Sequence, residues 1–144
     1  MLLASKERYA IAAIIDLAQS NDSCPTTVAD ISSRQNISLS YLEQILCKLK
    51  NAGIVTSVKG PGGGYILNFA PNDLVVLQII EAVAAPIKFT NCSSSSGCKQ
   101  KPANSHCTTH KFWKGLERNV KDYLGTVTID DICTNNIKIN NNSN

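Results

Sequence analysis

Residues 36–65, NISLSYLEQILCKLKNAGIVTSVKGPGGGY, place a helix and a hairpin one directly after the other. Over residues 40–52, apolar side chains recur at the spacing of one buried helix face: Leu42, Ile45, Leu46 and Leu49. Gly53 is positioned to end this helix as its C′ residue. Beyond it, two strands at residues 54–59 and 65–69 flank a glycine-rich turn, which predicts a β-hairpin.

A shorter helix precedes this stretch. Thr27 is expected to cap it, with Asp30 completing a capping-box-like pair, and the helix should end near Gln35. A short helix, a tight turn and a helix with one polar face form the helix-turn-helix pattern, and the hairpin after it reads as a wing. We also expect a first helix capped by Ser5 and an apolar helix that runs from a cap at Asp73 to about Val83.

This arrangement predicts a mainly α fold with a small β wing that binds double-stranded promoter DNA. The amino-terminal end of the recognition helix reaches base edges in the major groove, and a glutamine there can pair with adenine. Glu43 has two readings, a capping box with Ser40 or a contact to cytosine. The candidate DNA-binding residues are Ser38, Ser40, Tyr41, Glu43, Gln44, Lys48, Lys59, Gly60, Pro61 and Gly62.

The charge distribution agrees with DNA binding. The whole chain carries a net charge of +3, and residues 34–64 alone account for it, because Arg34, Lys48, Lys50 and Lys59 outnumber Glu43. A basic segment of this kind can neutralise phosphates and gives a salt-dependent affinity. If the charge were the only observation, this segment could equally be a basic surface that faces water and binds no partner.

Three of the six cysteines lie in a polar loop, in the pattern Cys92-x5-Cys98-x8-Cys107-x2-His110. Thiolates and imidazole suit zinc, copper or an iron–sulfur cluster. The Cys92–Cys98 spacing is wider than that of the usual zinc knuckle, which favours an iron–sulfur cluster over zinc or a bare thiol switch. His110 suits the fourth position better than His106, which adjoins Cys107. Cys24 and Cys47 are interpreted as small apolar residues.

The carboxyl-terminal part predicts a long helix over residues 109–127. Its apolar residues step by three and four, as in a coiled-coil seam, and we expect it to pair with a second copy of the chain through Trp113, Leu116, Val120, Tyr123 and Val127. The predicted organisation is a winged helix-turn-helix domain with a packing helix (1–84), a cysteine-bearing loop (85–108), a dimerisation helix and cap (109–132), and a disordered tail (133–144).

Several classes of protein are disfavoured. No apolar run approaches the ~18 residues of a membrane span, and the start of the chain reads as an amphipathic helix of a cytoplasmic protein. The glycine-rich turn lacks the Lys-Ser/Thr of a P-loop, and no nucleophile–base pair is found. We therefore expect no enzyme. A redox or cluster-carrying protein without DNA binding is the rival from another class.

Four segments together resemble the IscR family of iron–sulfur cluster-sensing transcription regulators: SKERYA (5–10), ADIS (29–32), ISLSYLEQ (37–44) and GPGGGY (60–65). The resemblance implies a homodimeric winged-helix factor with a 2Fe-2S cluster on Cys92, Cys98, Cys107 and His110, loaded by the iron–sulfur assembly machinery, that represses the assembly genes. It also implies that Glu43 helps to discriminate promoters. Related sensors with a 4Fe-4S cluster use an amino-terminal carboxylate at the region where Arg8 stands here. The Cys98–Cys107 gap and Lys59, where arginine is expected, depart from the family pattern.

Overall fold

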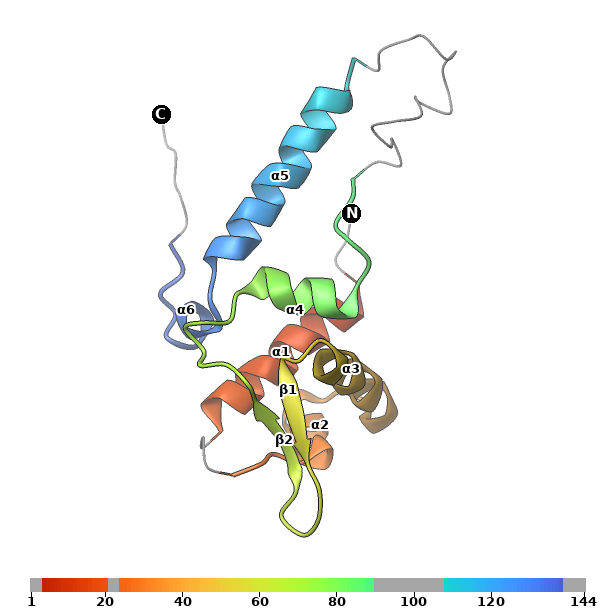
Figure 1. Ribbon diagram of the computed structural model, residues 1–144, viewed down its shortest axis with the longest axis vertical. Helices are drawn as coiled ribbons and strands as arrows, with labels where there is room; N and C mark the ends of the chain where they lie inside the picture. Colours follow the sequence, from red (N-terminus) through yellow and green to blue (C-terminus); the bar gives the residue numbers. More distant parts are fainter. Residues whose placement is uncertain (1–3, 21–23, 90–107, 139–144) are drawn as a thin grey trace.

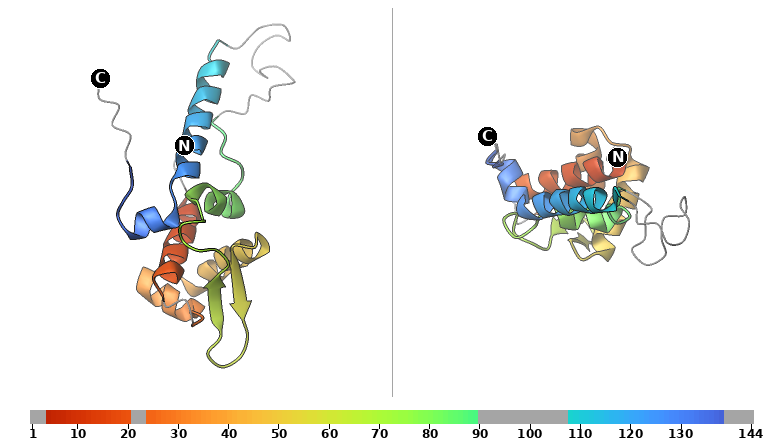
Figure 2. Two further views of the ribbon diagram at one scale, coloured as in Figure 1. Left: turned by 60° about the vertical axis from the view of Figure 1, so that its left-hand side comes forward. Right: turned by 90° about the horizontal axis from the view of Figure 1, so that it is seen from above.

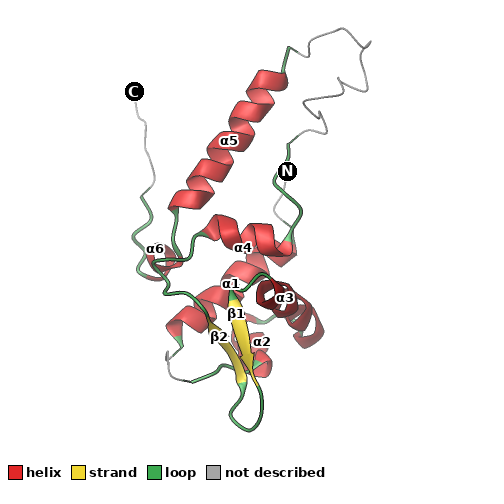
Figure 3. Ribbon diagram, in the orientation of Figure 1, coloured by secondary structure: helices red, strands yellow, loops and turns green. Residues whose placement is uncertain are grey.

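The computed structural model describes residues 4–20, 24–89 and 108–138 of the chain. Within these ranges the elements are, in order, α1 (Ser5–Gln19), α2 (Val28–Gln35), α3 (Leu39–Asn51), β1 (Val55–Val58), β2 (Gly64–Leu67), α4 (Val76–Val83), α5 (His110–Thr126) and α6 (Ile129–Cys133). Figures 1 and 3 show a helical body, a two-stranded wing below it and α5 extending away above it. The predicted mainly α architecture with a small β wing is confirmed.

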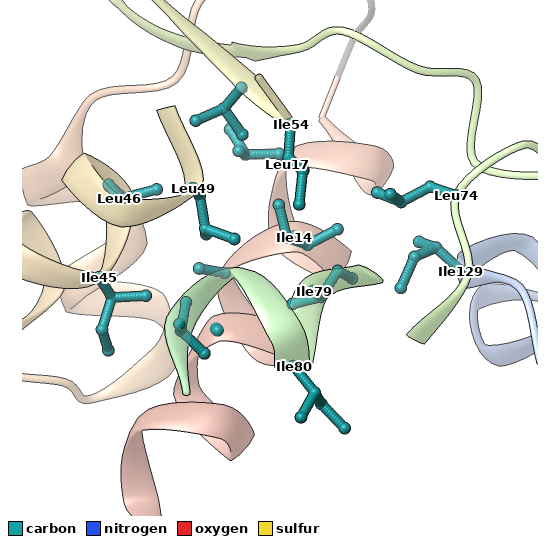
Figure 4. Packing of buried hydrophobic residues seen from close by; sticks show 14 of the residues in the cluster. Ile14, Leu17, Ile45, Leu46, Leu49, Ile54, Leu74, Ile79, Ile80 and Ile129 are labelled. Atoms are coloured by element: carbon teal, nitrogen blue, oxygen red, sulfur yellow. The ribbon is translucent and has the colours of Figure 1, made fainter. Parts of the chain in front are cut away.

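The core lies where α1, α3, α4 and α6 meet (Figure 4). Ile14 of α1, Leu46 of α3 and Ile79 of α4 are each fully buried. Burying such a side chain stabilises the fold by about 1.5–3 kcal/mol. Ile129 of α6 completes the cluster from the far end of the chain, with no accessible surface. The helix-turn-helix is thus built on a scaffold that includes residues from both ends of the sequence.

The helix-turn-helix has the predicted capping at α2. The Asp30 N–H donates to Thr27 Oγ1 at 3.1 Å, and the Thr27 hydroxyl donates to the Asp30 carboxylate at 2.6 Å. Asn36 ends α2 with φ of 53°, and Ile37 buries its side chain before α3 begins. Gly53 follows α3 with φ of 75°, in the left-handed conformation predicted for a C′ residue.

The wing pairs Val55 with Leu67 and Val58 with Gly64 in an antiparallel register. Thr26, just before α2, forms an isolated antiparallel bridge with Tyr65 of β2. The Thr26 N–H donates to the Tyr65 carbonyl at 3.0 Å, and the Tyr65 N–H donates to the Thr26 carbonyl at 2.8 Å. Gly64 makes this approach possible, because a Cβ there would lie 2.3 Å from the Thr26 carbonyl oxygen. The wing is therefore fixed to the turn that starts the helix-turn-helix.

Two predicted helix starts are wrong. The N-cap of α1 is Ala4, and Ser5 is already helical. The N-cap of α4 is Val75 instead of Asp73, and the Val75 N–H donates to Gln78 Oε1 at 3.1 Å. Val75 is held extended by a bridge to Thr128, in which the Ile129 N–H donates to the Leu74 carbonyl at 2.9 Å. A long-range pairing therefore delays the helix by two residues.

An ion pair between a buried carboxylate and a half-exposed arginine joins α1 to α2. Asp16 is 5% exposed, and Arg34 donates to it through Nη2 at 2.6 Å and Nε at 3.0 Å. Gln35 Nε2 donates to the same carboxylate at 2.9 Å. The hydrogen bond from Arg34 holds the pKa of Asp16 below its ordinary value, although burial opposes this. Arg34, predicted to belong to the basic DNA surface, is thus engaged in holding the fold together.

This ion pair predicts a pH-dependent stability. Because the native pKa of Asp16 is lowered, its contribution is present above the unfolded value of about 3.9 and is lost as the pH falls through the native pKa. The free energy of unfolding of the wild type should exceed that of Asp16→Asn at neutral pH, and the difference should shrink in acid. Urea unfolding of both proteins across the acidic range measures it. A difference that stays constant with pH would contradict the prediction.

Beyond α5 the structure describes the chain up to residue 138. Cys133 closes α6, and the Asn136 N–H donates to the Asp131 carbonyl at 2.8 Å. The predicted tail of 133–144 therefore begins inside described structure, and residues 139–144 lie outside it. No helix within the described ranges is long and apolar enough to cross a membrane.

Candidate functional site

The outward face of α3 is the candidate DNA-reading surface. Its inner side is buried by Leu42, Ile45, Leu46 and Leu49, as predicted. With 3.6 residues per turn, the exposed side chains on the opposite side are Ser40, Glu43, Gln44, Cys47 and Asn51. Ser40 and Gln44 lie near the amino-terminal end, the part of a recognition helix that reaches base edges.

The first turn of α3 differs from the prediction. The helix begins at Leu39 with Ser38 as its N-cap, and the Leu42 N–H donates to the Ser38 carbonyl at 3.0 Å. Ser40 is inside the helix, so the predicted capping box between Ser40 and Glu43 is wrong. The exposed Glu43 carboxylate makes no hydrogen bond or ion pair within the described ranges. A capping role for Glu43 is therefore excluded, and its carboxylate is available to a ligand on the outward face of α3.

Two predicted DNA contacts lie on the flank of α3 and point toward neighbouring helices. Tyr41 is half-buried and packs edge-to-face on Tyr9 of α1, with ring centroids 5.9 Å apart. Lys48 Nζ donates to the Val83 carbonyl at the end of α4, at 3.3 Å. These two side chains therefore connect the recognition helix to α1 and α4.

The tip of the wing presents the remaining predicted contacts. Lys59, Gly60, Pro61 and Gly62 are all exposed, and the turn is closed by the Gly63 N–H donating to the Gly60 carbonyl at 2.9 Å. Gly60 adopts φ of 93°, a conformation that favours glycine. Figures 1 and 2 show the hairpin extending beyond the helical body. The ammonium of Lys59 makes no hydrogen bond or ion pair to any described residue, so it is free to contact a phosphate.

The predicted metal ligands are placed in part. His110 is the first residue of α5 and is half-buried. Cys92, Cys98 and Cys107 lie outside the described residues. Within the described ranges, no group of three histidine, cysteine, aspartate or glutamate residues could hold a metal ion. Of the four metal ligands predicted from the sequence, the structure therefore describes only His110.

Within the described chain, the apolar stripe of α5 is covered by its own domain along one edge only. Val120 and Leu124 pack against the core of their own domain, and Val127, at 8% exposure, lies beyond the helix end and accepts a hydrogen bond from the Val76 N–H at 3.0 Å. Val127 is therefore part of the core, which corrects its predicted place in the seam. A second face carries Phe112, Leu116 and Tyr123. Phe112 is 64% exposed and Tyr123 is 46% exposed.

Three side chains were misjudged from the sequence. Cys24 and Cys47 are exposed instead of buried. Cys47 lies in the middle of the outward face of α3. It follows Ser40 by seven residues, or two helical turns, and this spacing indicates that the two share one face. Phe112, which precedes Leu116 by four residues, is exposed on α5 and is not among the residues that the sequence predicts for the seam. Cys133 is half-buried, and burial raises the pKa of its thiol.

The chain matches a known family over nearly its whole length. The family model Rrf2, described as an iron-dependent transcriptional regulator, matches residues 3–135. This chain belongs to the Rrf2 family. Among its relatives, the HTH-type transcriptional regulator IscR of Pectobacterium carotovorum is 42% identical over 135 residues, covering 94% of this chain and 80% of the relative. IscR of Aliivibrio salmonicida is 40% identical over 94% of this chain and 79% of its own length.

Solved structures of Rrf2 proteins share the fold. T. potens IscR superposes with a TM-score of 0.76 at 29% identity, covering 94% of this chain and 88% of the other. CymR (YrzC), described as the global cysteine regulator of B. subtilis, has a TM-score of 0.79 at 27% identity, over 94% and 98% of the two chains. This Rrf2 protein is thus a winged-helix transcriptional regulator and not an enzyme, as the sequence predicted.

Proposed function

We propose that this Rrf2 protein binds promoter DNA as a homodimer and senses iron–sulfur status through a 2Fe-2S cluster held by Cys92, Cys98, Cys107 and His110. By this proposal it controls iron–sulfur assembly genes from the cytoplasm and receives its cluster from the assembly machinery. One observation carries the proposal: this chain is 42% identical to a protein named IscR, and its sequence holds three cysteines and a histidine within residues 92–110, after the helix-turn-helix.

The donor set fits an iron–sulfur cluster chemically. Cysteine thiolates ligate iron–sulfur clusters, and histidine replaces cysteine in some of them and raises the reduction potential. The cluster, when bound, supplies an electron-transfer centre that oxidation can destroy. His110 begins α5, so a ligand bound there would tie the cysteine-bearing segment to that helix. Occupancy is proposed to order residues 91–110 and thereby to reposition α3 or α5.

Dimerisation is supported by the exposed apolar face of α5. Within the described chain none of its residues is buried, yet Phe112, Leu116 and Tyr123 share one side of the helix. Water contact with such a face is unfavourable, and covering it with the same face of a second copy is a self-complementary solution. A dimer would present two recognition helices, as dimeric helix-turn-helix proteins do on half-sites about 34 Å apart.

DNA binding by the outward face predicts different effects at two positions. Gln44→Ala should weaken binding to the cognate promoter about 5- to 150-fold and relax specificity at one base pair, because a bidentate base contact is lost. Lys59→Met should weaken binding to all sequences alike and lower the salt-dependence slope by about one. Fluorescence anisotropy over a salt series measures both. Equal losses on cognate and random DNA for Gln44→Ala would contradict its base-reading role.

The cofactor is tested by the visible absorption spectrum and the metal content of protein purified without oxygen. Absorption between about 320 and 600 nm, with iron and sulfide in equal amounts, supports the cluster. A colourless protein that contains one zinc ion would indicate a structural zinc site. A colourless, metal-free protein would favour a thiol switch. Either colourless result contradicts the proposed sensing function.

A further inference from the structure

Lys48 joins the DNA-reading helix to the end of α4. Its ammonium donates to the Val83 carbonyl at 3.3 Å, and Val83 is the last residue of that helix. The carboxyl-terminal end of a helix carries partial negative charge and unpaired carbonyls, so a lysine placed there is favourable. This contact spans 35 positions of sequence and directs the lysine of the recognition helix toward α4.

Gln44 shares the environment of this contact. Gln44 and Lys48 are one helical turn apart on α3, and with Val83 they line one small cavity, about 40 Å³ in volume, between α1, α3 and α4. Lys6 of α1 and Tyr41 line the same cavity. Helices α3 and α4 pack against each other through buried side chains such as Ile45 and Ile80. Because packed helices move together, a displacement of the end of α4 would shift α3, which carries the exposed Gln44, the predicted base-reading residue.

The end of α4 also leads to the predicted ligand segment. Helix α4 ends at Val83, and the chain continues past Pro86 without regular structure before Ile87, at 3% exposure, anchors it in the core. Phe89 packs against the same core. Cys92, the first predicted ligand, follows Ile87 by five residues in the sequence. The Lys48–Val83 contact is therefore one link, beside the direct packing of α3 on α4, between the recognition helix and the segment that leads to the cysteines.

We infer that Lys48 is a positioning residue for Gln44, which couples the placement of α3 to the end of α4 and so to ligand occupancy at the cysteines. The inference rests on the proposed sensing function. It assigns Lys48 a role other than the phosphate contact predicted from the sequence. The DNA-reading face and the cysteine ligands would both act on the position of α3, so binding at one would change affinity at the other. Because such coupling is reciprocal, DNA binding must in turn favour the cluster-bound form.

The test compares DNA affinity with and without the cluster in matched variants. Affinity for an assembly-gene promoter fragment is measured by anisotropy for cluster-loaded protein and for protein that carries Cys92→Ala. Both measurements are made for the otherwise wild-type protein and for three variants: Lys48→Met, Lys48→Arg and Lys50→Met. Lys50 is a suitable control, because it lies on α3, loses the same charge and makes no side-chain hydrogen bond or ion pair to any described residue.

The inference predicts that Lys48→Met brings the ratio of the two affinities toward one, by at least about threefold. Lys48→Arg should keep the ratio, since it retains a donor and a charge, and Lys50→Met should weaken both forms equally. A Lys48→Met protein that keeps the wild-type ratio while its salt slope falls by about one, as for a phosphate contact, would overturn the inference. A wild-type ratio of one would instead overturn the sensing function itself, and the inference with it.

Discussion

Replacement of Cys92 by alanine is expected to abolish the visible absorption of protein purified without oxygen, while the protein stays folded and dimeric. One missing thiolate removes a quarter of the proposed ligand set, and an incompletely ligated cluster is easily lost. The core of the winged helix is formed by residues of α1, α3, α4 and α6, so its folding should not require the cluster. Absorption spectra, circular dichroism and sedimentation measure the three properties.

Cys47→Ala is the matched control for this experiment. Cys47 is exposed on α3, and the described residues around it form no potential metal group. This variant should keep its colour, because it removes a thiol without touching the proposed ligands. Unfolding of Cys92→Ala would show that the site is structural and would contradict a sensing role. An unchanged spectrum would exclude Cys92 as a ligand.

The second large effect is expected at the exposed face of α5. Phe112→Asp should convert the dimer to a monomer, because it places a carboxylate where 64% of a phenylalanine side chain is exposed for a partner. A monomer has one recognition helix and binds one half-site at a time. Promoter binding should then weaken by about a hundredfold or more, because the second half-site is no longer bound by a tethered subunit. Analytical ultracentrifugation and anisotropy on a two-half-site fragment measure these effects.

Lys114→Asp provides the control on the same helix. Lys114 is exposed and lies two residues from Phe112, on the polar side of α5. The introduced carboxylate should leave the dimer intact there. If Phe112→Asp remained dimeric, or if both variants dissociated alike, the proposed dimer interface would be wrong.

Local signals allowed much of the fold to be predicted from the sequence. Thr27 caps the start of α2 and Gly53 follows the end of α3 as expected, because caps depend on residues within one turn. The start of α3 lies two residues earlier than predicted, because Ser38 is its N-cap and Ser40, an equally plausible cap by residue type, lies inside the helix. The sequence between them holds no feature that separates the two.

The remaining errors have tertiary causes. Asp73 was expected to cap α4, but the bridge between Val75 and Thr128 keeps the chain extended for two more residues. The same pairing buries Val127, which has the spacing of a seam residue and yet belongs to the core. Lys48 was assigned to phosphate from its charge, whereas its partner, the Val83 carbonyl, is 35 positions away. Such pairings between distant segments leave no local pattern in the sequence.

The proposed sensing function requires that cluster occupancy change the affinity of the protein for DNA. The decisive measurement is the affinity of cluster-loaded and cluster-free wild-type protein for the promoter of the iron–sulfur assembly genes from the same genome, at one fixed salt concentration. The loaded protein is expected to bind more tightly by about 5- to 150-fold, the usual range of such couplings. Equal affinities of the two forms would contradict the sensing function.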